Sequence, residues 1–64
     1  MIMFAWIMNY QKEGFSPEIV DRNGIVIEVL PKAASRSVAT KKIRKWAQEH
    51  PETPVIFMPS KEIL

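Results

Sequence analysis

The sequence contains no cysteine, and this absence excludes two common ways of stabilising a small domain. Neither a disulfide nor a cysteine-ligated metal site can form. His50 is the single histidine, so the ligand set of a structural zinc site is missing as well. The 64 residues suffice for one domain over 1–64, and a chain of this size buries only about 60% of the surface that the unfolded chain exposes. Its stability therefore has to come from apolar packing, from a protein partner or from self-association.

Long hydrophobic runs are also lacking. The longest apolar run is residues 1–8, whereas a membrane-spanning helix needs about 20 apolar residues. The run has neither the preceding positive charge nor the following small-residue cleavage site of a signal peptide. We therefore expect residues 1–8 to form a strand, and we expect a cytoplasmic protein that does not associate with membranes.

Acidic residues are missing from the middle of the chain. No aspartate or glutamate occurs between Val29 and Gln48. The basic residues of that region are Lys32, Arg36, Lys41, Lys42, Arg44 and Lys45. The net charge is only +2, so the asymmetry says more about possible partners than the total does.

The stretch from residue 35 onward predicts a helix followed by a strand. Ser35 or Ser37 can cap the helix, because a serine oxygen accepts a hydrogen bond from a free amide at the helix start. The helix should run from Ser37 to about Glu49 and end before Pro51, which cannot continue it. Apolar residues fall at i, i+4, i+7 and i+8, the spacing of a core-facing helix side: Ala39, Ile43, Trp46 and Ala47. The apolar run 55–58 then suits a buried strand.

The segment Asp21-Arg22-Asn23-Gly24 predicts a β-hairpin, because Asn-Gly accepts the positive φ values of tight turns. The hairpin should pair residues 17–20 with residues 25–30. We expect one of the two alternating sets of side chains in the second strand to face the helix, namely Ile25, Ile27 and Val29. The other set should face away from it: Val26, Glu28 and Leu30.

Together these elements predict an α+β fold with the order β-β-β-α-β. A small antiparallel sheet of three to four strands would carry one α-helix on one face. Apolar residues are then left for the second face: Phe4, Trp6, Val26, Leu30, Ile56 and Met58. Either this apolar patch stays exposed as an interface, or the loop 9–16 folds over it with Tyr10 and Phe15.

Candidate catalytic residues are isolated from one another. His50 has no nucleophile at a diagnostic spacing, and a histidine in the last turn of a helix suits the helix dipole. The carboxylates of the hairpin, Glu18, Asp21 and Glu28, are expected to be solvated charges. Gly14 and Gly24 are the only glycines and do not form a phosphate-binding loop. We expect no enzyme, no cofactor and no bound metal.

Two functions from different classes remain. The first is a small protein-binding module of the inhibitor, adaptor or regulator type; small sheet-plus-helix proteins of this element order include phage-encoded inhibitors. It would bind through the second sheet face or a strand edge plus the basic helix, using Phe4, Trp6, Leu30, Lys41, Arg44 and Lys45. The alternative is a nucleic-acid-binding protein whose helix 35–49 contacts phosphates through Lys32, Arg36, Lys41, Lys42, Arg44 and Lys45. Self-association is compatible with either function. The apolar excess favours protein binding, since a solvated basic helix needs no explanation.

Overall fold

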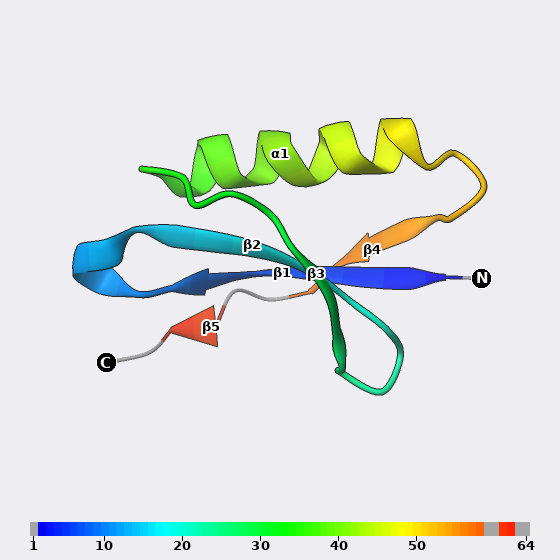
Figure 1. Cartoon of the computed structure of the whole chain (residues 1–64), viewed down its shortest axis with the longest axis horizontal. Coiled ribbons are helices and arrows are strands. Elements are labelled where there is room, and N and C mark those ends of the chain that lie inside the picture. The colour runs from blue at the N-terminus through cyan, green and yellow to red at the C-terminus, as the bar shows by residue number, and fades with distance from the viewer. Residues whose placement is uncertain (1, 59–60, 63–64) are drawn as a thin grey trace.

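The computed structural model describes residues 2–58 and 61–62 of the chain (Figure 1). Its elements are β1 (Met3–Asn9), the short 3-10 helix η1 (Gln11–Glu13), β2 (Phe15–Val20), β3 (Val26–Val29), α1 (Arg36–Glu49), β4 (Val55–Phe57) and β5 (Lys61–Glu62). The predicted α+β class and the order β-β-β-α-β are confirmed. The strand β5 is an addition that no feature of the sequence indicated.

The sheet is built around β1. Its strand order is β3-β2-β1-β4, and β5 also pairs with β1. The β1–β2 and β2–β3 pairs are antiparallel, whereas β4 and β5 run parallel to β1. The sheet is therefore mostly antiparallel but mixed, because α1 forms the crossover that brings the chain from β3 into β4 in the same direction. The apolar side chains on both sides of β1 match this central position.

The helix α1 begins and ends where the local chemistry requires. Ser35 is the N-cap, and its Oγ accepts a hydrogen bond from the Val38 amide at 3.2 Å. At the other end the His50 amide donates to the Ala47 carbonyl at 3.2 Å, and Pro51 prevents continuation. Of the predicted inward residues, Ala39, Ile43 and Trp46 are buried and Ala47 is half-buried. Within the described residues no helix has the length and apolarity to cross a membrane.

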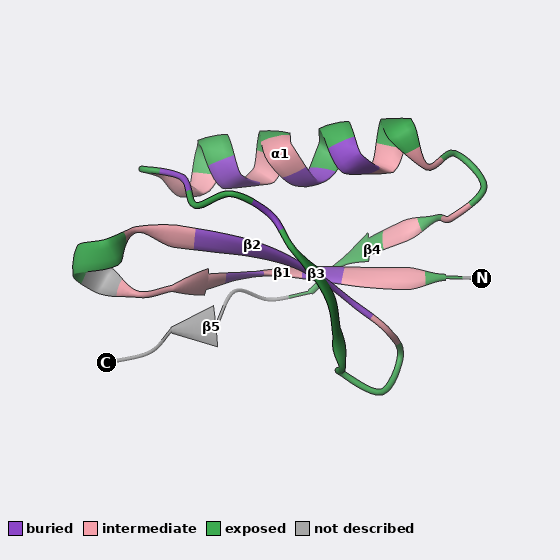
Figure 2. Cartoon of the chain, viewed as in Figure 1, coloured by how far each residue is buried: buried purple, intermediate pink, exposed green. Residues whose placement is uncertain are grey.

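The hydrophobic core lies between α1 and one face of the sheet, which we call the covered face (Figures 1 and 2). The covered face carries Ala5 and Ile7 of β1 and Ile19 of β2. The buried cluster consists of Ala5, Ile7, Ile19, Leu30, Ala33, Ala39, Ile43 and Trp46. One helix is enough to exclude water from this side of a sheet of such short strands.

The predicted orientation of residues 25–30 is wrong except at Val26, which lies opposite Val20 on the face away from α1, as predicted. Leu30 is buried in the core and Glu28 lies opposite Ile19 on the covered face, whereas Val29 lies opposite Glu18 on the other face. Ile25, Ile27 and Val29, expected to face the helix, are all exposed. The β2–β3 register shifts at Ile19/Val20, and a shift of one residue exchanges the two faces of a strand.

The loop before β2 does not cover the second face. Phe15 packs against the covered-face cluster, and its backbone exchanges hydrogen bonds with Ala33, at 2.9 Å and 2.8 Å. The ring of Tyr10 lies 5.3 Å from Lys32 Nζ. The alternative in which Tyr10 and Phe15 fold over the second face is therefore wrong.

Candidate protein-binding surface

The face of the sheet opposite α1 is apolar, and we call it the open face. Cross-strand pairs place Phe4 beside Val20 and Ile56, and Trp6 beside Glu18. The strand residues of the open face are Phe4, Trp6, Met8, Ser16, Glu18, Val20, Val26, Val29 and Ile56. The described part of the chain supplies no second layer over it (Figure 1).

Exposure on the open face increases from its centre to its margins. Val20, which lies between β1 and β3, is buried although the described residues place no second layer over it. At the margins Val29 is 58% exposed and Ile56 is 47% exposed. Figure 2 shows the same pattern, since β3 is exposed along its whole length. Large contiguous apolar patches are rare on the surface of monomeric proteins and usually mark an interaction site.

A buried carboxylate lies in the middle of the open face. Glu18 is only 7% exposed, and its Oε1 accepts a hydrogen bond from Trp6 Nε1 at 2.6 Å. No other hydrogen bond from the described residues reaches this carboxylate, and none of their fully buried side-chain oxygens lacks a partner. The second oxygen, Oε2, is therefore accessible to solvent.

A small pocket of about 110 Å³ adjoins this pair. Its lining residues are Phe4, Trp6, Val20, Asp21, Arg22, Gly24 and Met58. The apolar part comes from β1, from β2 and from Met58, which follows β4, and the polar part comes from the β2–β3 turn. That turn is fixed by Asp21, whose Oδ1 accepts from the amides of Asn23 at 2.8 Å and Ile25 at 3.0 Å. The indole of Trp6 is thus both a wall of the pocket and the hydrogen-bond donor to Glu18.

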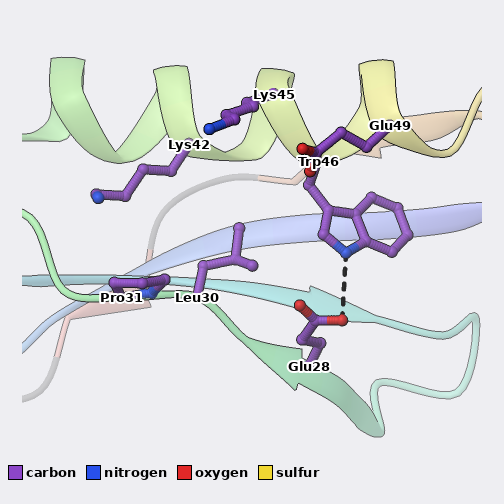
Figure 3. A pocket seen from close by; sticks show the side chains of 7 residues that line it. All are labelled: Glu28, Leu30, Pro31, Lys42, Lys45, Trp46 and Glu49. Carbon is purple, nitrogen blue, oxygen red and sulfur yellow. Dashed lines mark hydrogen bonds between the residues drawn. The ribbon is translucent and has the colours of Figure 1, made fainter.

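On the covered side a groove of about 240 Å³ lies between β3 and α1 (Figure 3). Its lining residues are Glu28, Leu30, Pro31, Lys42, Lys45, Trp46 and Glu49. Trp46 Nε1 donates to Glu28 Oε1 at 3.3 Å, which connects the helix to the edge strand. In Figure 3 the Lys42 and Lys45 side chains extend together away from Trp46.

His50 serves the end of the helix. Its ring stacks on Trp46 with the ring centroids 3.9 Å apart, and its Nδ1 lies 2.8 Å from the Trp46 carbonyl oxygen. Both contacts tie it to the last turn of α1. Among the described residues no group of three histidine, aspartate or glutamate side chains is placed to hold a metal ion.

The predicted basic residues separate into two groups. Lys32 forms an ion pair with Glu13 at 3.9 Å, and Arg36 lies over the Phe15 ring at 5.3 Å. The second group lies on α1 and makes no ion pair with a described residue: Lys41, Lys42, Arg44 and Lys45. The structure therefore does not form one continuous patch from all six residues.

Comparisons with protein-family models, with curated proteins and with solved structures find no match to this chain. Its function has to be inferred from its own surfaces. Phe4 and Trp6 lie on the open face, as predicted, but Leu30 is 8% exposed and belongs to the core, so its predicted place on that face is wrong. The helix lies on the opposite side of the sheet, so the apolar and basic groups predicted to act together are separated by the sheet (Figure 1).

The sequence reasoning missed Glu18, which it treated as a solvated charge. A signal was present, because Glu18 directly precedes Ile19 and Val20 in an apolar strand. The carboxylate of an acidic residue in such a strand has to be either hydrated or hydrogen-bonded to a donor of the protein. The donor, Trp6, comes from a different strand, and only the pairing register brings the two together.

Proposed function

We propose that the chain is a small, non-enzymatic protein-binding module that docks through its open face. One observation supports this: the sheet is apolar on both faces, but the described chain covers only one of them. Association would remove the apolar side chains of the open face from water, and this burial is the main driving force of most protein interfaces. Inhibitors, adaptors and regulators all act through such contacts.

The proposed occupant is a different protein rather than a second copy. In a face-to-face dimer each copy would bring its own Glu18 into an apolar contact. Charges in such a contact are costly unless each has an oppositely charged or donor partner. A different protein can supply a complementary surface, whereas an identical copy brings the same acid twice.

The basic helix contributes to this function from a distance. Lys41, Arg44 and Lys45 do not border the open face, so they would not join its apolar contact. A positive surface attracts acidic groups of a partner that lie outside the open-face contact, and such attraction accelerates the encounter more than it strengthens the final complex. The proposal therefore assigns affinity to the open face and association rate to α1.

The test captures a binding partner with the wild-type protein, purifies it, and compares its binding to two double variants. Val29→Lys with Ile56→Lys charges the open face at exposed positions. Lys41→Ala with Lys45→Ala removes charge from α1 and is the matched control. We expect a partner that, once purified, binds the wild type and the helix variant in calorimetry but binds the open-face variant at least tenfold more weakly. Two results would contradict this proposal. One is a purified partner whose binding is lost only in the helix variant. The other is a wild type that sediments as a dimer and that the open-face variant converts to a monomer.

Nucleic-acid binding is the second candidate, and the α1 cations Lys41, Lys42, Arg44 and Lys45, which make no ion pair with a described residue, favour it. Phosphates neutralised by lysine or arginine release counterions, which gives affinity without sequence preference. The test is fluorescence anisotropy with labelled duplex and single-stranded oligonucleotides at low and near-physiological salt. Micromolar binding that weakens steeply with salt and disappears in the Lys41→Glu, Lys45→Glu variant would support this function. No binding at low salt would eliminate it.

A further inference from the structure

We infer that the partner of the open face presents a basic side chain to Glu18 and an aliphatic side chain to the pocket beside Trp6. This inference rests on the proposed function and specifies the chemistry of its partner. It depends on one carboxylate, one indole and one small pocket, all within the open face.

The Glu18 carboxylate is held in position but only half paired. Trp6 Nε1 fixes Oε1 at 2.6 Å, while Oε2 has no partner among the described residues. The side chain is already more than nine-tenths buried, so little further water has to be removed when a partner arrives. Its position is also largely fixed in advance, which lowers the conformational cost of binding.

The missing partner of Oε2 should be a cation. A protein that covers the open face removes the water that now reaches Oε2, and the carboxylate then needs a replacement donor. The indole is a neutral donor and leaves the negative charge uncompensated. A lysine or arginine supplies both a donor and the opposite charge, and such charge-assisted hydrogen bonds are the strongest available here.

The pocket specifies the second partner group. This open pocket of about 110 Å³ has an apolar wall of Phe4, Trp6, Val20 and Met58, and Asp21 and Arg22 line its polar side. An apolar cavity of about 150 Å³ accommodates benzene, so this pocket suits one aliphatic side chain. Trp6 borders both the pocket and the Glu18 carboxylate. The basic and aliphatic side chains of the partner therefore have to lie close together in space.

Within the described residues, the open face of a second copy does not offer adjacent basic and aliphatic side chains. Arg22 lines the pocket there, but it stands between Asp21 and Asn23. A second copy would offer its own open face, whose central ionisable group is again Glu18. The cations of α1 lie on the other side of the sheet and cannot reach the open face of the same molecule. The recognition chemistry therefore points to another protein with a short basic-aliphatic segment.

The test uses a displayed library of random eight-residue peptides, selected on the purified wild-type protein. Enriched peptides are synthesised and measured by fluorescence anisotropy against Glu18→Gln and against Glu28→Gln, its matched control on the covered side. Both substitutions keep a hydrogen-bond acceptor for the tryptophan and remove one charge, and circular dichroism verifies that each variant folds. We expect enriched peptides with a lysine or arginine next to an aliphatic residue, a loss of affinity of at least tenfold in Glu18→Gln, and a change of less than twofold in Glu28→Gln.

The other outcomes separate this inference from the function on which it rests. In the first, the enriched peptides contain no basic residue, bind Glu18→Gln as tightly as the wild type, and fail to bind the Val29→Lys, Ile56→Lys variant. This result would overturn the inference and leave the open face as the binding surface. Peptides that are insensitive to both open-face changes, or no enrichment at all, would overturn both. If the enriched peptides were acidic and did not bind the Lys41→Ala, Lys45→Ala variant, the binding surface would be α1 and not the open face.

Discussion

Each face of the sheet carries one hydrogen bond from a tryptophan to a glutamate, and the two pairs differ in what surrounds them. On the covered side, Trp46 of α1 reaches down to Glu28 at the sheet edge, at 3.3 Å, and Glu28 is exposed. On the open side, Trp6 and Glu18 belong to adjacent strands, their distance is 2.6 Å, and Glu18 is buried. The first pair closes a junction between two layers. The second lies on a single layer, in a position where a second layer would complete it.

The apolar residues of the two faces show the same contrast. On the central strand β1, Ala5 and Ile7 of the covered face are buried, whereas Phe4, Trp6 and Met8 of the open face are only half-buried. Both sets are apolar, so their chemistry does not separate them. The presence of α1 on one side separates them, and this is why the open face is the better candidate for a partner.

The largest effect is expected from shortening a side chain with which α1 packs on the covered face. Ile43 is 1% exposed and belongs to the core cluster. The Ile43→Ala variant should lose about 2–5 kcal/mol in the free energy of unfolding, because it loses buried methyl groups and leaves a cavity. Urea denaturation followed by circular dichroism measures this loss.

The matched control is Ile56→Ala on the open face. Because Ile56 is 47% exposed and no second layer of described residues covers it, the free energy of unfolding of this variant should differ from that of the wild type by less than about 1 kcal/mol. A loss as large as that of Ile43→Ala would mean that the open face is covered in solution, and the comparison of the two faces would fail.

A smaller effect is expected at the glycine that lets β2 approach the segment before α1. Gly14 has φ +96°, and an added Cβ would lie 2.8 Å from the Ala33 carbonyl oxygen. The Gly14→Ala variant should lose about 1–3 kcal/mol, since it combines backbone strain with a steric clash beside the covered core. Gly24 also has positive φ, at +81°, but has nothing within 4 Å of an added Cβ. Thermal unfolding should therefore show a larger decrease in Tm for Gly14→Ala than for Gly24→Ala, and equal decreases would refute the contribution of the clash.

The smallest effect is expected at the start of α1, the layer that distinguishes the two faces. Ser35→Ala removes the side-chain acceptor of the Val38 amide and should cost about 1 kcal/mol. Ser37→Ala, inside the first turn, should change the stability by less than about 0.5 kcal/mol. Hydrogen exchange should show faster exchange of the Val38 amide in the first variant only. If the Val38 amide exchanged faster in both variants, capping could not be attributed to Ser35 alone.

The sequence was sufficient for the elements that depend on local chemistry. The spacing of Ala39, Ile43 and Trp46 predicted α1 and its inward side, and Ser35 was one of the two predicted caps. The segment from Asp21 to Gly24 predicted the hairpin. In each case residues close together in the chain decide the outcome, so no knowledge of distant partners was needed.

The remaining features depend on register and on distant pairing. The irregularity at Ile19/Val20 reversed the predicted orientation of β3 and moved Leu30 into the core. The parallel direction of β4 depends on the path of the crossover, which its own residues do not encode. The Trp6–Glu18 pair depends on how β1 and β2 align, so the most specific feature of the candidate site could not be derived from either strand alone.

The central position of β1 has a consequence for how the chain reaches its native state. β1 pairs with β2 soon after it in the chain, but its other edge waits for β4 and β5, where Met3 meets Val55 and Asn9 meets Glu62. Closing contacts between such distant segments is slow, because the chain loses the entropy of a long loop before the contacts form. During synthesis the first strand therefore has one unsatisfied edge until residues 55–62 have been made, and an unpaired apolar edge of this kind readily pairs with other chains.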